Sequence, residues 1–216
     1  MHTRIPKVYT NGLPRAHRDS RLFLIACEGE KTEFQYFSFP FLVHPRVKIK
    51  VIRSDEGASS PTYVLDNLRK LIKDVRREYD LKPSDRFWLV IDRDRWDLYE
   101  QIDKVINKRI GNKPVNVAVS NPSFELFLYL HFNDLPDKPI ERSSDMEALL
   151  RKTIGGYSKR NLREEDYING YKDAVRRSLL SSHDSFGIPV NPGTDVGKIL
   201  NEIQENVPKR RNQSIR

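Results

Sequence analysis

The strongest constraint on the fold is an apolar run of strand length that stops abruptly at two carboxylates. Phe87 to Ile91 is followed at once by Asp92-Arg93-Asp94. A continuous hydrophobic run of this length is typical of a parallel strand buried on both faces of a sheet. In open α/β sheets, functional sites lie at the carboxyl ends of the strands. The run therefore predicts an α/β fold with Asp92 and Asp94 at a functional edge.

Two further apolar runs end in the same way. Residues 21–27 stop at Glu28, and residues 115–119 are followed by a segment that carries Glu125. If these strands are neighbours, their carboxylates gather at one edge and repel one another unless protons or cations are present. Oxygen ligands suit Mg²⁺ or Mn²⁺ rather than zinc. Either motif alone would favour a simpler interpretation, in which Asp92 caps a helix and Glu28 is a solvated loop residue, but the joint pattern favours a metal site.

The remaining pattern predicts one more strand and several helices. A strand is expected at 47–52, near an edge of the sheet, because apolar and basic residues alternate there. Apolar stripes at helical spacing predict the helices. Their expected ranges are 32–42, 61–79, 97–110, 122–132, 144–152, 164–181 and a last helix around 196–203.

Several helix ends have local signals. Pro61 fits a first helical turn, and Gly111-Asn112 indicates a stop. Asn121 is expected to cap the helix that begins at Pro122, and Ser144 is expected to open a capping box. The helix 122–132 is apolar nearly all round, so it should be buried. His131 on this helix is interpreted as a hydrogen-bonded core residue rather than a ligand.

Composition narrows the possible partners. The 216 residues carry 38 Lys and Arg against 30 Asp and Glu, a formal net charge of +8. This excess suits a polyanion such as nucleic acid, although basicity alone is weak evidence. The single cysteine, Cys27, indicates a small core residue in a reducing compartment. No apolar segment reaches transmembrane length and the first residues do not resemble a signal peptide, so a cytoplasmic location without membrane contact is expected.

The same motifs carry a resemblance to known families. Glu28-Gly29 after a first strand and Asp92-x-Asp94 after a later one resemble the Toprim catalytic core of primases, topoisomerases and certain nucleases. Between about Leu22 and Ile203 the chain more narrowly resembles the RloB family of Toprim-like proteins from bacterial restriction and abortive-infection loci. The motifs that carry this resemblance are Cys27-Glu-Gly-Glu-Lys-Thr-Glu33, Ile91-Asp-Arg-Asp94, Asn121-Pro-Ser-Phe-Glu-Leu-Phe127 with His131-Phe132, and Asn191-Pro-Gly-Thr194.

The resemblance implies a fold and an order of segments. The expected architecture is a Toprim-like, mostly parallel four-stranded sheet flanked by helices, with a C-terminal helical extension. A basic N-terminal arm (1–20) would precede the catalytic core (21–135). The helical extension (136–206) would pack on the core, and a basic tail (207–216) would follow.

The resemblance also implies a function and partners. It indicates a nuclease that depends on Mg²⁺ or Mn²⁺, cleaves DNA or RNA in phage defence, and works beside an AAA-type or ABC-type ATPase, with a homo-oligomer left open. Topoisomerase or primase activity is not expected, because no accessory module and no zinc-binding cysteine set accompany the core. The rival hypothesis is a non-catalytic Toprim-like regulatory or nucleic-acid-binding subunit. Retention of Glu28, Asp92 and Asp94 favours catalysis.

Individual residues have expected roles in such a nuclease. The metal ligands expected are Glu28, Asp92, Asp94 and Glu125, with Glu33 or Glu30 as a further ligand or general base. Lys159 is a candidate catalytic cation, because a positive charge beside a scissile phosphate stabilises the developing negative charge. The expected contacts to the nucleic-acid backbone are Lys31, Arg93, Arg95 and Arg160.

Overall fold

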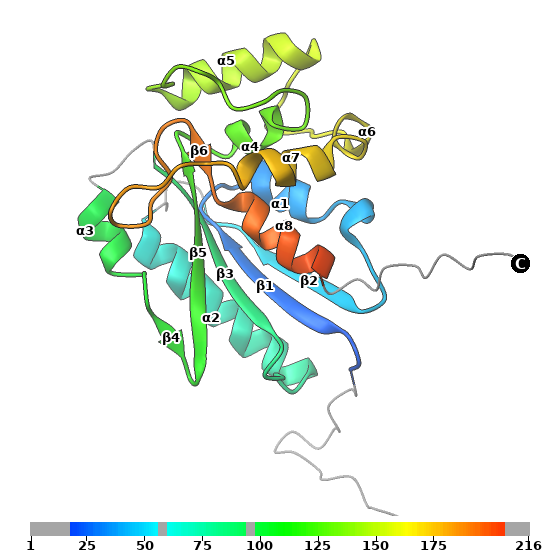
Figure 1. Cartoon of the computed structure of the whole chain (residues 1–216). Helices are drawn as coiled ribbons and strands as arrows, with labels where there is room; N and C mark the ends of the chain where they lie inside the picture. The colour runs from blue at the N-terminus through cyan, green and yellow to red at the C-terminus, as the bar shows by residue number, and fades with distance from the viewer. Residues whose placement is uncertain (1–17, 56–59, 94–97, 206–216) are drawn as a thin grey trace, which may run out of the picture.

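A mostly parallel, curled sheet forms the centre of the protein, with helices on both faces (Figure 1). The computed structural model describes residues 18–55, 60–93 and 98–205. The strand order is β2-β1-β3-β5-β4, and β6 pairs with the far end of β5. The parallel strands are β2 (Val47–Ile52), β1 (Arg21–Cys27), β3 (Arg86–Asp92) and β5 (Lys113–Asn121). The antiparallel strands are β4 (Arg109–Ile110) and β6 (Gly193–Thr194).

The four expected strands are therefore confirmed, including the position of β2 at an edge of the sheet. The expected strand number was wrong, because the sheet also contains β4 and β6. Gly111-Asn112, interpreted as the end of a helix, instead forms the turn between β4 and β5, with Gly111 at a φ of +60°. Each additional strand has only two residues, which is too short for a periodic sequence pattern.

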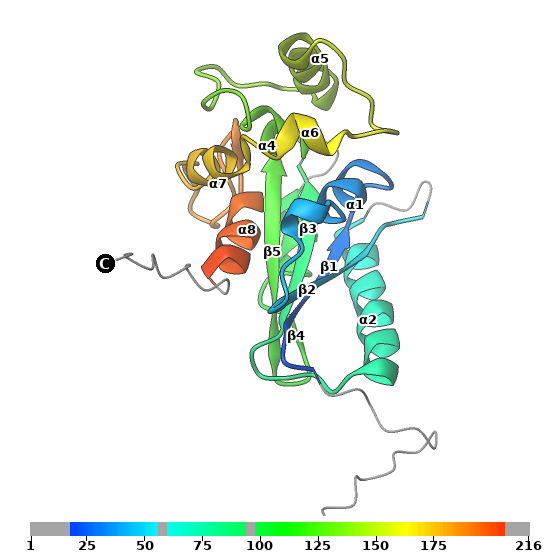
Figure 2. The ribbon, with the colours of Figure 1, turned by 90° about the vertical axis from the view of Figure 1, so that its right-hand side faces the viewer.

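The strands bury their side chains in two layers because successive residues point to opposite faces. Phe23, Ile25 and Cys27 of β1 belong to one core, and Leu22 and Leu24 belong to the other. The first core is covered by α1 (Thr32–Phe37), α4 (Glu125–Tyr129), α7 (Tyr171–Ser178) and α8 (Val196–Glu205). The second core is covered by α2 (Pro61–Glu78) and α3 (Leu98–Asp103). Figure 2 shows α2 and α8 on opposite sides of the sheet.

The long helix α2 follows its sequence pattern closely. Pro61 occupies its first turn, and the Ser60 hydroxyl accepts a hydrogen bond from the Tyr63 N–H at 3.3 Å. The apolar stripe is buried through Val64 and Leu68 against the second core. The prediction of a helix over 61–79 is therefore confirmed to within one residue.

Two other helices are shorter than expected. The helix predicted over 97–110 ends at Asp103, and the chain then turns into β4. The helix predicted over 164–181 is broken into α6 (Glu164–Tyr167) and α7. The break has a packing reason: a Cβ on Gly170 would lie 2.2 Å from the backbone oxygen of His131. Glycine at this position lets the chain pass close against the segment that follows α4.

The apolar helix α4 begins later than its cap signals indicated. Strand β5 continues through Asn121, and Phe124 is the N-cap residue of α4. The Asn121 side chain donates to the Pro189 carbonyl at 2.9 Å instead of capping a helix, so the predicted cap was wrong. Burial of this helix is confirmed, with Leu126 and Phe127 fully enclosed.

Two further helices differ from the prediction, one in its N-terminal cap and one in its length. Helix α5 (Ser143–Ile154) has Arg142 as its N-cap and no side-chain cap, so the capping box at Ser144 is absent. The helix predicted over 32–42 is divided at Pro40 into α1 and a 3₁₀ turn (Pro40–Leu42).

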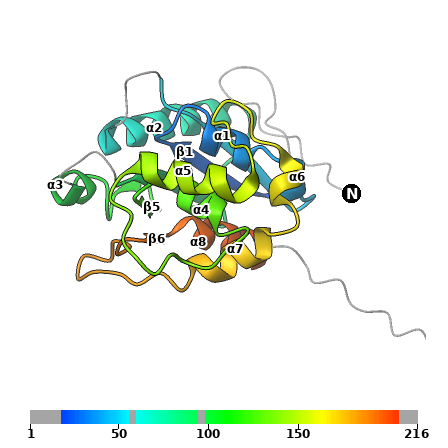
Figure 3. The same ribbon diagram turned by 90° about the horizontal axis from the view of Figure 1, so that it is seen from above.

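The carboxyl edge of the sheet is covered by helices. Seen from above, α5 passes across this edge, with α4 next to the sheet (Figure 3). Glu28 directly follows β1 and Asp92 is the last residue of β3, so both lie at this edge of the sheet. In the described ranges, no helix is both long and apolar enough to cross a membrane. Residues 1–17 of the expected arm and the whole tail 207–216 lie outside those ranges.

Candidate active site at the carboxyl edge of the sheet

Two carboxylate residues lie at the adjoining ends of β1 and β3. The Glu28 N–H donates to the Val90 carbonyl at 2.9 Å, which continues the β1–β3 ladder by one residue. The Asp92 N–H then donates to Glu28 Oε2 at 3.0 Å. The Glu28 residue is buried and Asp92 is half-buried. Parallel pairing of two buried strands thus brings together the two acidic motifs that the sequence separates by 64 positions.

A third carboxyl group, Glu33, folds back over Gly29. The Gly29 N–H donates to Glu33 Oε1 at 3.1 Å. A Cβ on Gly29 would lie 2.0 Å from Glu33 Oε2, so the position must be glycine for the carboxyl to take this place. Burial raises the pKa of Glu33 to about 7, and the charge of Glu125 contributes to the rise, whereas the Gly29 hydrogen bond and Lys159 oppose it.

The fourth carboxyl group, Glu125, begins α4 and is almost fully enclosed. Its Oε2 accepts a hydrogen bond from the Ser123 hydroxyl at 2.6 Å. Its Oε1 accepts one from the Tyr157 hydroxyl at 2.8 Å and lies 3.2 Å from Lys159 Nζ. Burial, followed by the charge of Glu125, raises the pKa of Tyr157, so its phenol keeps the proton that it donates. We call Glu28, Glu33, Asp92 and Glu125 the carboxylate cluster.

The buried thiol of Cys27 lies near two of these carboxylates. Burial raises its pKa well above the usual value, and the charges of Glu33 and Asp92 raise it further. Cys27 is therefore a neutral core residue in the first core, as the sequence predicts, and it lies close to the cluster.

Lys159 supplies the positive charge at this edge. Its ammonium lies 3.2 Å from Glu125 Oε1 and 3.4 Å from Glu147 Oε2 of α5, and the side chain is 45% exposed. Burial lowers the pKa of Lys159, but the two carboxylates more than offset this effect and the net change is upward. Lys159 is therefore protonated at neutral pH and placed between the buried cluster and solvent.

The residues predicted to contact nucleic acid occupy less defined positions than Lys159. Lys31 is exposed and its ammonium lies 3.8 Å from Glu30 Oε2. Arg160 is exposed next to Lys159. The Arg93 N–H donates to the Ser120 carbonyl at 2.9 Å, so its backbone is fixed at the same strand ends. Asp94 and Arg95 lie outside the described residues.

Two supporting residues were not assigned roles from the sequence. Tyr157 and Ser123 both hold the Glu125 carboxylate. Tyr157 and Lys159 lie two residues apart and both reach Glu125, but their spacing alone did not indicate this contact. Ser123 offered no signal, because its contact depends on the course of the chain between β5 and α4.

His131 belongs to the core beneath the cluster. Its Nε2 lies 3.0 Å from the Tyr36 hydroxyl, and its Nδ1 lies 3.0 Å from the Phe127 carbonyl. Burial lowers its pKa to about 4, so the imidazole is neutral at pH 7. The interpretation of His131 as a hydrogen-bonded core histidine is confirmed.

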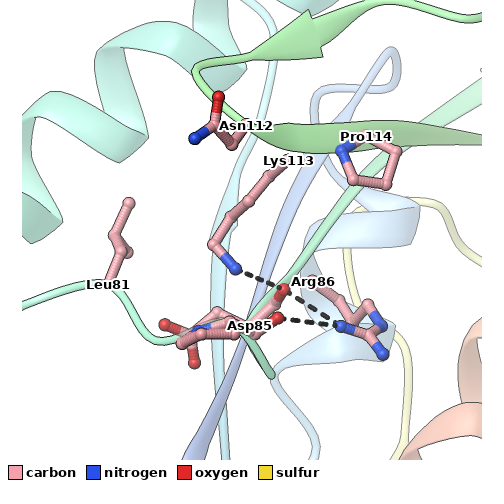
Figure 4. A pocket seen from close by; sticks show the side chains of 7 residues that line it. Leu81, Asp85, Arg86, Asn112, Lys113 and Pro114 are labelled. Atoms are coloured by element: carbon pink, nitrogen blue, oxygen red, sulfur yellow. Dashed lines mark hydrogen bonds between the residues drawn. The ribbon is translucent and has the colours of Figure 1, made fainter.

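A separate cavity of about 300 Å³ opens at the amino edge of the sheet, at the opposite end of β3 from Asp92 (Figure 4). The Lys113 ammonium and the Arg86 guanidinium both reach the backbone oxygen of Asp85, each at 3.4 Å. The cavity is lined by Leu81, Pro83, Asp85, Arg86, Asn112, Lys113 and Pro114. Because it lies at the other end of the strands, it is not part of the candidate active site.

Comparison with known proteins places the chain in one family. Neither the curated proteins nor the solved structures that were compared gave a match. The family model for RloB-like proteins matches residues 23–203, a range that contains the carboxylate cluster, Tyr157 and Lys159. This match covers most of the chain, and the protein therefore belongs to the RloB-like family.

Proposed function

We propose that this protein is a metal-dependent nuclease of the Toprim class that hydrolyses phosphodiester bonds in DNA or RNA. The observation that carries the proposal is the pairing of Glu28 and Asp92, through the Asp92 N–H, at the carboxyl edge of a mostly parallel sheet. In this proposal, strands β2, β1, β3 and β5 form a Toprim-like core. The net charge of +8 suits the polyanionic substrate.

The donor chemistry at this edge fits a hard divalent cation. Glu28 and Asp92 offer carboxylate oxygens, and the nearby thiol of Cys27 is buried and protonated. Within the described ranges, no three His, Cys, Asp or Glu residues are placed to hold a metal ion. We propose Asp94, which lies outside those ranges, as the third ligand beside Glu28 and Asp92. When bound, Mg²⁺ or Mn²⁺ would activate water and stabilise the leaving oxygen.

Glu125 fits the predicted ligand set less directly. Its two oxygens already receive hydrogen bonds from Ser123 and Tyr157 and an ion pair from Lys159. Its role as a ligand therefore stays a prediction, in which a cation would share the carboxylate with these partners. In the present arrangement Glu125 holds the Lys159 ammonium at the edge of the cluster.

The chain itself supplies two further chemical groups. Lys159 Nζ is protonated and partly exposed, so it can neutralise charge on an incoming phosphate. The Glu33 carboxyl has a pKa of about 7, the range in which a general base is effective at neutral pH. We propose that Glu33 accepts the proton released when water is activated.

One observation favours the second candidate, a non-catalytic subunit that binds nucleic acid or regulates a defence complex. The Lys159 ammonium already forms an ion pair with Glu125, as a structural cation would. The proposed role in phage defence, the ATPase partner and a homo-oligomer apply to either candidate, because they rest on the family resemblance alone.

Cleavage assays test the proposal. Purified protein is incubated with labelled duplex DNA, single-stranded DNA and total tRNA in Mg²⁺, Mn²⁺ or EDTA. Asp92→Asn is expected to lower cleavage by about 100-fold or more, since it removes a ligand worth several kcal/mol in the transition state. Asp74→Asn is the matched control, because Asp74 is exposed on α2 and pairs with Arg77 on the same helix.

The outcomes separate the two candidates. Metal-dependent cleavage that is lost in Asp92→Asn and kept in Asp74→Asn supports the nuclease and identifies its substrate. Equal cleavage by both variants would refute the assigned site. Nucleic-acid binding without cleavage, and without metal binding by calorimetry, would favour the non-catalytic subunit.

A further inference from the structure

The segment between α5 and α6 crosses the candidate site with few attachments of its own. It leaves α5 through Gly155, which has a φ of +71°, and Gly156, where an added Cβ would meet no neighbour. Tyr157 and Leu162 are buried, whereas residues 158–161 are exposed. We call residues 157–162 the lysine loop. Because its exposed part has no core contacts, polar bonds must fix the position of Lys159.

One side chain from α1 supplies these bonds. The Gln35 Nε2 donates to the Lys159 carbonyl at 2.8 Å, and Gln35 Oε1 accepts from the Leu162 N–H at 3.0 Å. The same Nε2 donates to the Lys31 carbonyl at 3.0 Å, one turn earlier in its own helix. Only one orientation of the amide satisfies all three bonds, because two partners are carbonyls and the third is an N–H.

The amide therefore joins the backbone of Lys159 to that of Leu162, on either side of the exposed residues 160 and 161. Thr32 of the same helix lies 3.4 Å from the Tyr157 hydroxyl, so α1 contacts the lysine loop at both ends. At the other end of the Lys159 side chain, the ammonium is held by Glu125 and Glu147. Gln35 thus holds the backbone of Lys159, and the two carboxylates hold its ammonium, so a shift of the backbone would strain or break the ion pairs.

We propose that Gln35 is a positioning residue that holds the lysine loop so that the Lys159 ammonium stays over the carboxylate cluster, ready to exchange Glu125 for a substrate phosphate. Gln35 does not touch the reacting atoms in this proposal, and it acts through Lys159. The role in catalysis rests on the proposed nuclease function, whereas the fixing of the loop does not.

Two variants of Gln35 distinguish the effects of its individual hydrogen bonds. Gln35→Met keeps the length of the side chain and removes all three hydrogen bonds. Gln35→Glu keeps an acceptor for the Leu162 N–H and loses the donor to the Lys159 carbonyl. Ser38→Ala is the matched control, because among the described residues its hydroxyl donates to the Phe34 carbonyl of α1 and not to the lysine loop.

Two measurements do not need catalysis. Amide hydrogen exchange at Leu162 is expected to rise about fivefold or more in Gln35→Met and to stay near wild type in Gln35→Glu and Ser38→Ala. Acylation of Lys159 by an amine-reactive reagent, followed by mass spectrometry, is expected to accelerate in both Gln35 variants. Unchanged Leu162 exchange or unchanged Lys159 acylation in Gln35→Met would overturn the positioning role.

The third measurement concerns the proposed reaction. Both Gln35 variants are expected to lose about 10-fold to 100-fold in kcat, with KM little changed, because a displaced ammonium weakens the transition state more than substrate binding. An unchanged kcat in a variant with accelerated Lys159 acylation would refute the catalytic part alone. Failure of the wild type to cleave would refute the proposed nuclease, while the exchange and acylation results still decide whether Gln35 fixes the loop.

Discussion

Replacing Glu33 with glutamine should make the metal-free protein more stable at high pH. The Glu33 carboxyl has a pKa of about 7 in the folded state, against an ordinary value of 4.5. When ionised, it is a buried negative charge close to Glu125. Glutamine keeps the shape and an acceptor for the Gly29 N–H, which donates to Glu33 at 3.1 Å, but it carries no charge.

The expected size follows from linkage. The two pKa values differ by about 2.5, and at about 1.4 kcal/mol for each pH unit the ionised form destabilises the fold by about 3 kcal/mol. Because the folded pKa is raised, the unfolded state releases its proton first as pH increases. Stability therefore falls as pH rises from about 4.5 to 7 and changes little from this group above that range.

Urea unfolding in EDTA measures this effect. At pH 8.5, Glu33→Gln is expected to exceed the wild type by about 3 kcal/mol in the free energy of unfolding, and at pH 5 by less than about 1 kcal/mol. Glu30→Gln is the control, since Glu30 is partly exposed beside Lys31 and should change stability by less than about 0.5 kcal/mol at either pH. An advantage of Glu33→Gln that does not change with pH would refute the reasoning, as would a wild type that is the more stable protein at pH 8.5.

Two other substitutions test the packing around the site, again by urea unfolding. Gly29→Ala places a Cβ 2.0 Å from Glu33 Oε2, so the carboxyl must leave its place, and a loss of about 1–3 kcal/mol is expected; wild-type stability would contradict the assigned contact. Tyr36→Phe removes the partner that lies 3.0 Å from His131 Nε2 and leaves a buried nitrogen without its hydrogen bond, a loss of about 1–3 kcal/mol. Because burial lowers the pKa of His131 to about 4, this loss should be the same at pH 7 and 8.5, and a pH-dependent loss would indicate a charged imidazole.

The central strands and their acidic ends could be predicted because the signals are local. Each apolar run fits a buried parallel strand, and parallel pairing then places Glu28 beside Asp92 without further information. The same reasoning predicted α2, whose stripe, proline and serine cap lie within one segment. Local signals did not suffice everywhere: the stop at Gly111-Asn112 and the caps at Asn121 and Ser144 were predicted from single stretches and are not what the structure has.

Other errors came from contacts between distant segments. The break at Gly170 depends on the backbone of His131, 39 positions earlier, and β6 forms only because residues 193–194 return to the end of β5. The bonds of Gln35 to the lysine loop likewise join residues 124 and 127 positions apart. A helical pattern around Gln35 indicates which residues are apolar, but it contains no information on what a polar side chain will reach.

Helix α1 contributes both a buried carboxyl group and the residue that fixes the lysine loop to the candidate site. Its six residues include Glu33 and Gln35. The Glu33 carboxyl beside Gly29 destabilises the fold when it is ionised, and Gln35 fixes the lysine loop. So short a helix is not stable in isolation, and it is held by Tyr36 and Phe37 in the aromatic core. Core packing therefore provides the stability that a group of buried carboxylates removes. A cation that binds only the folded state would recover part of that loss, so the arrangement that weakens the metal-free fold at high pH is also the one that favours binding of a cation.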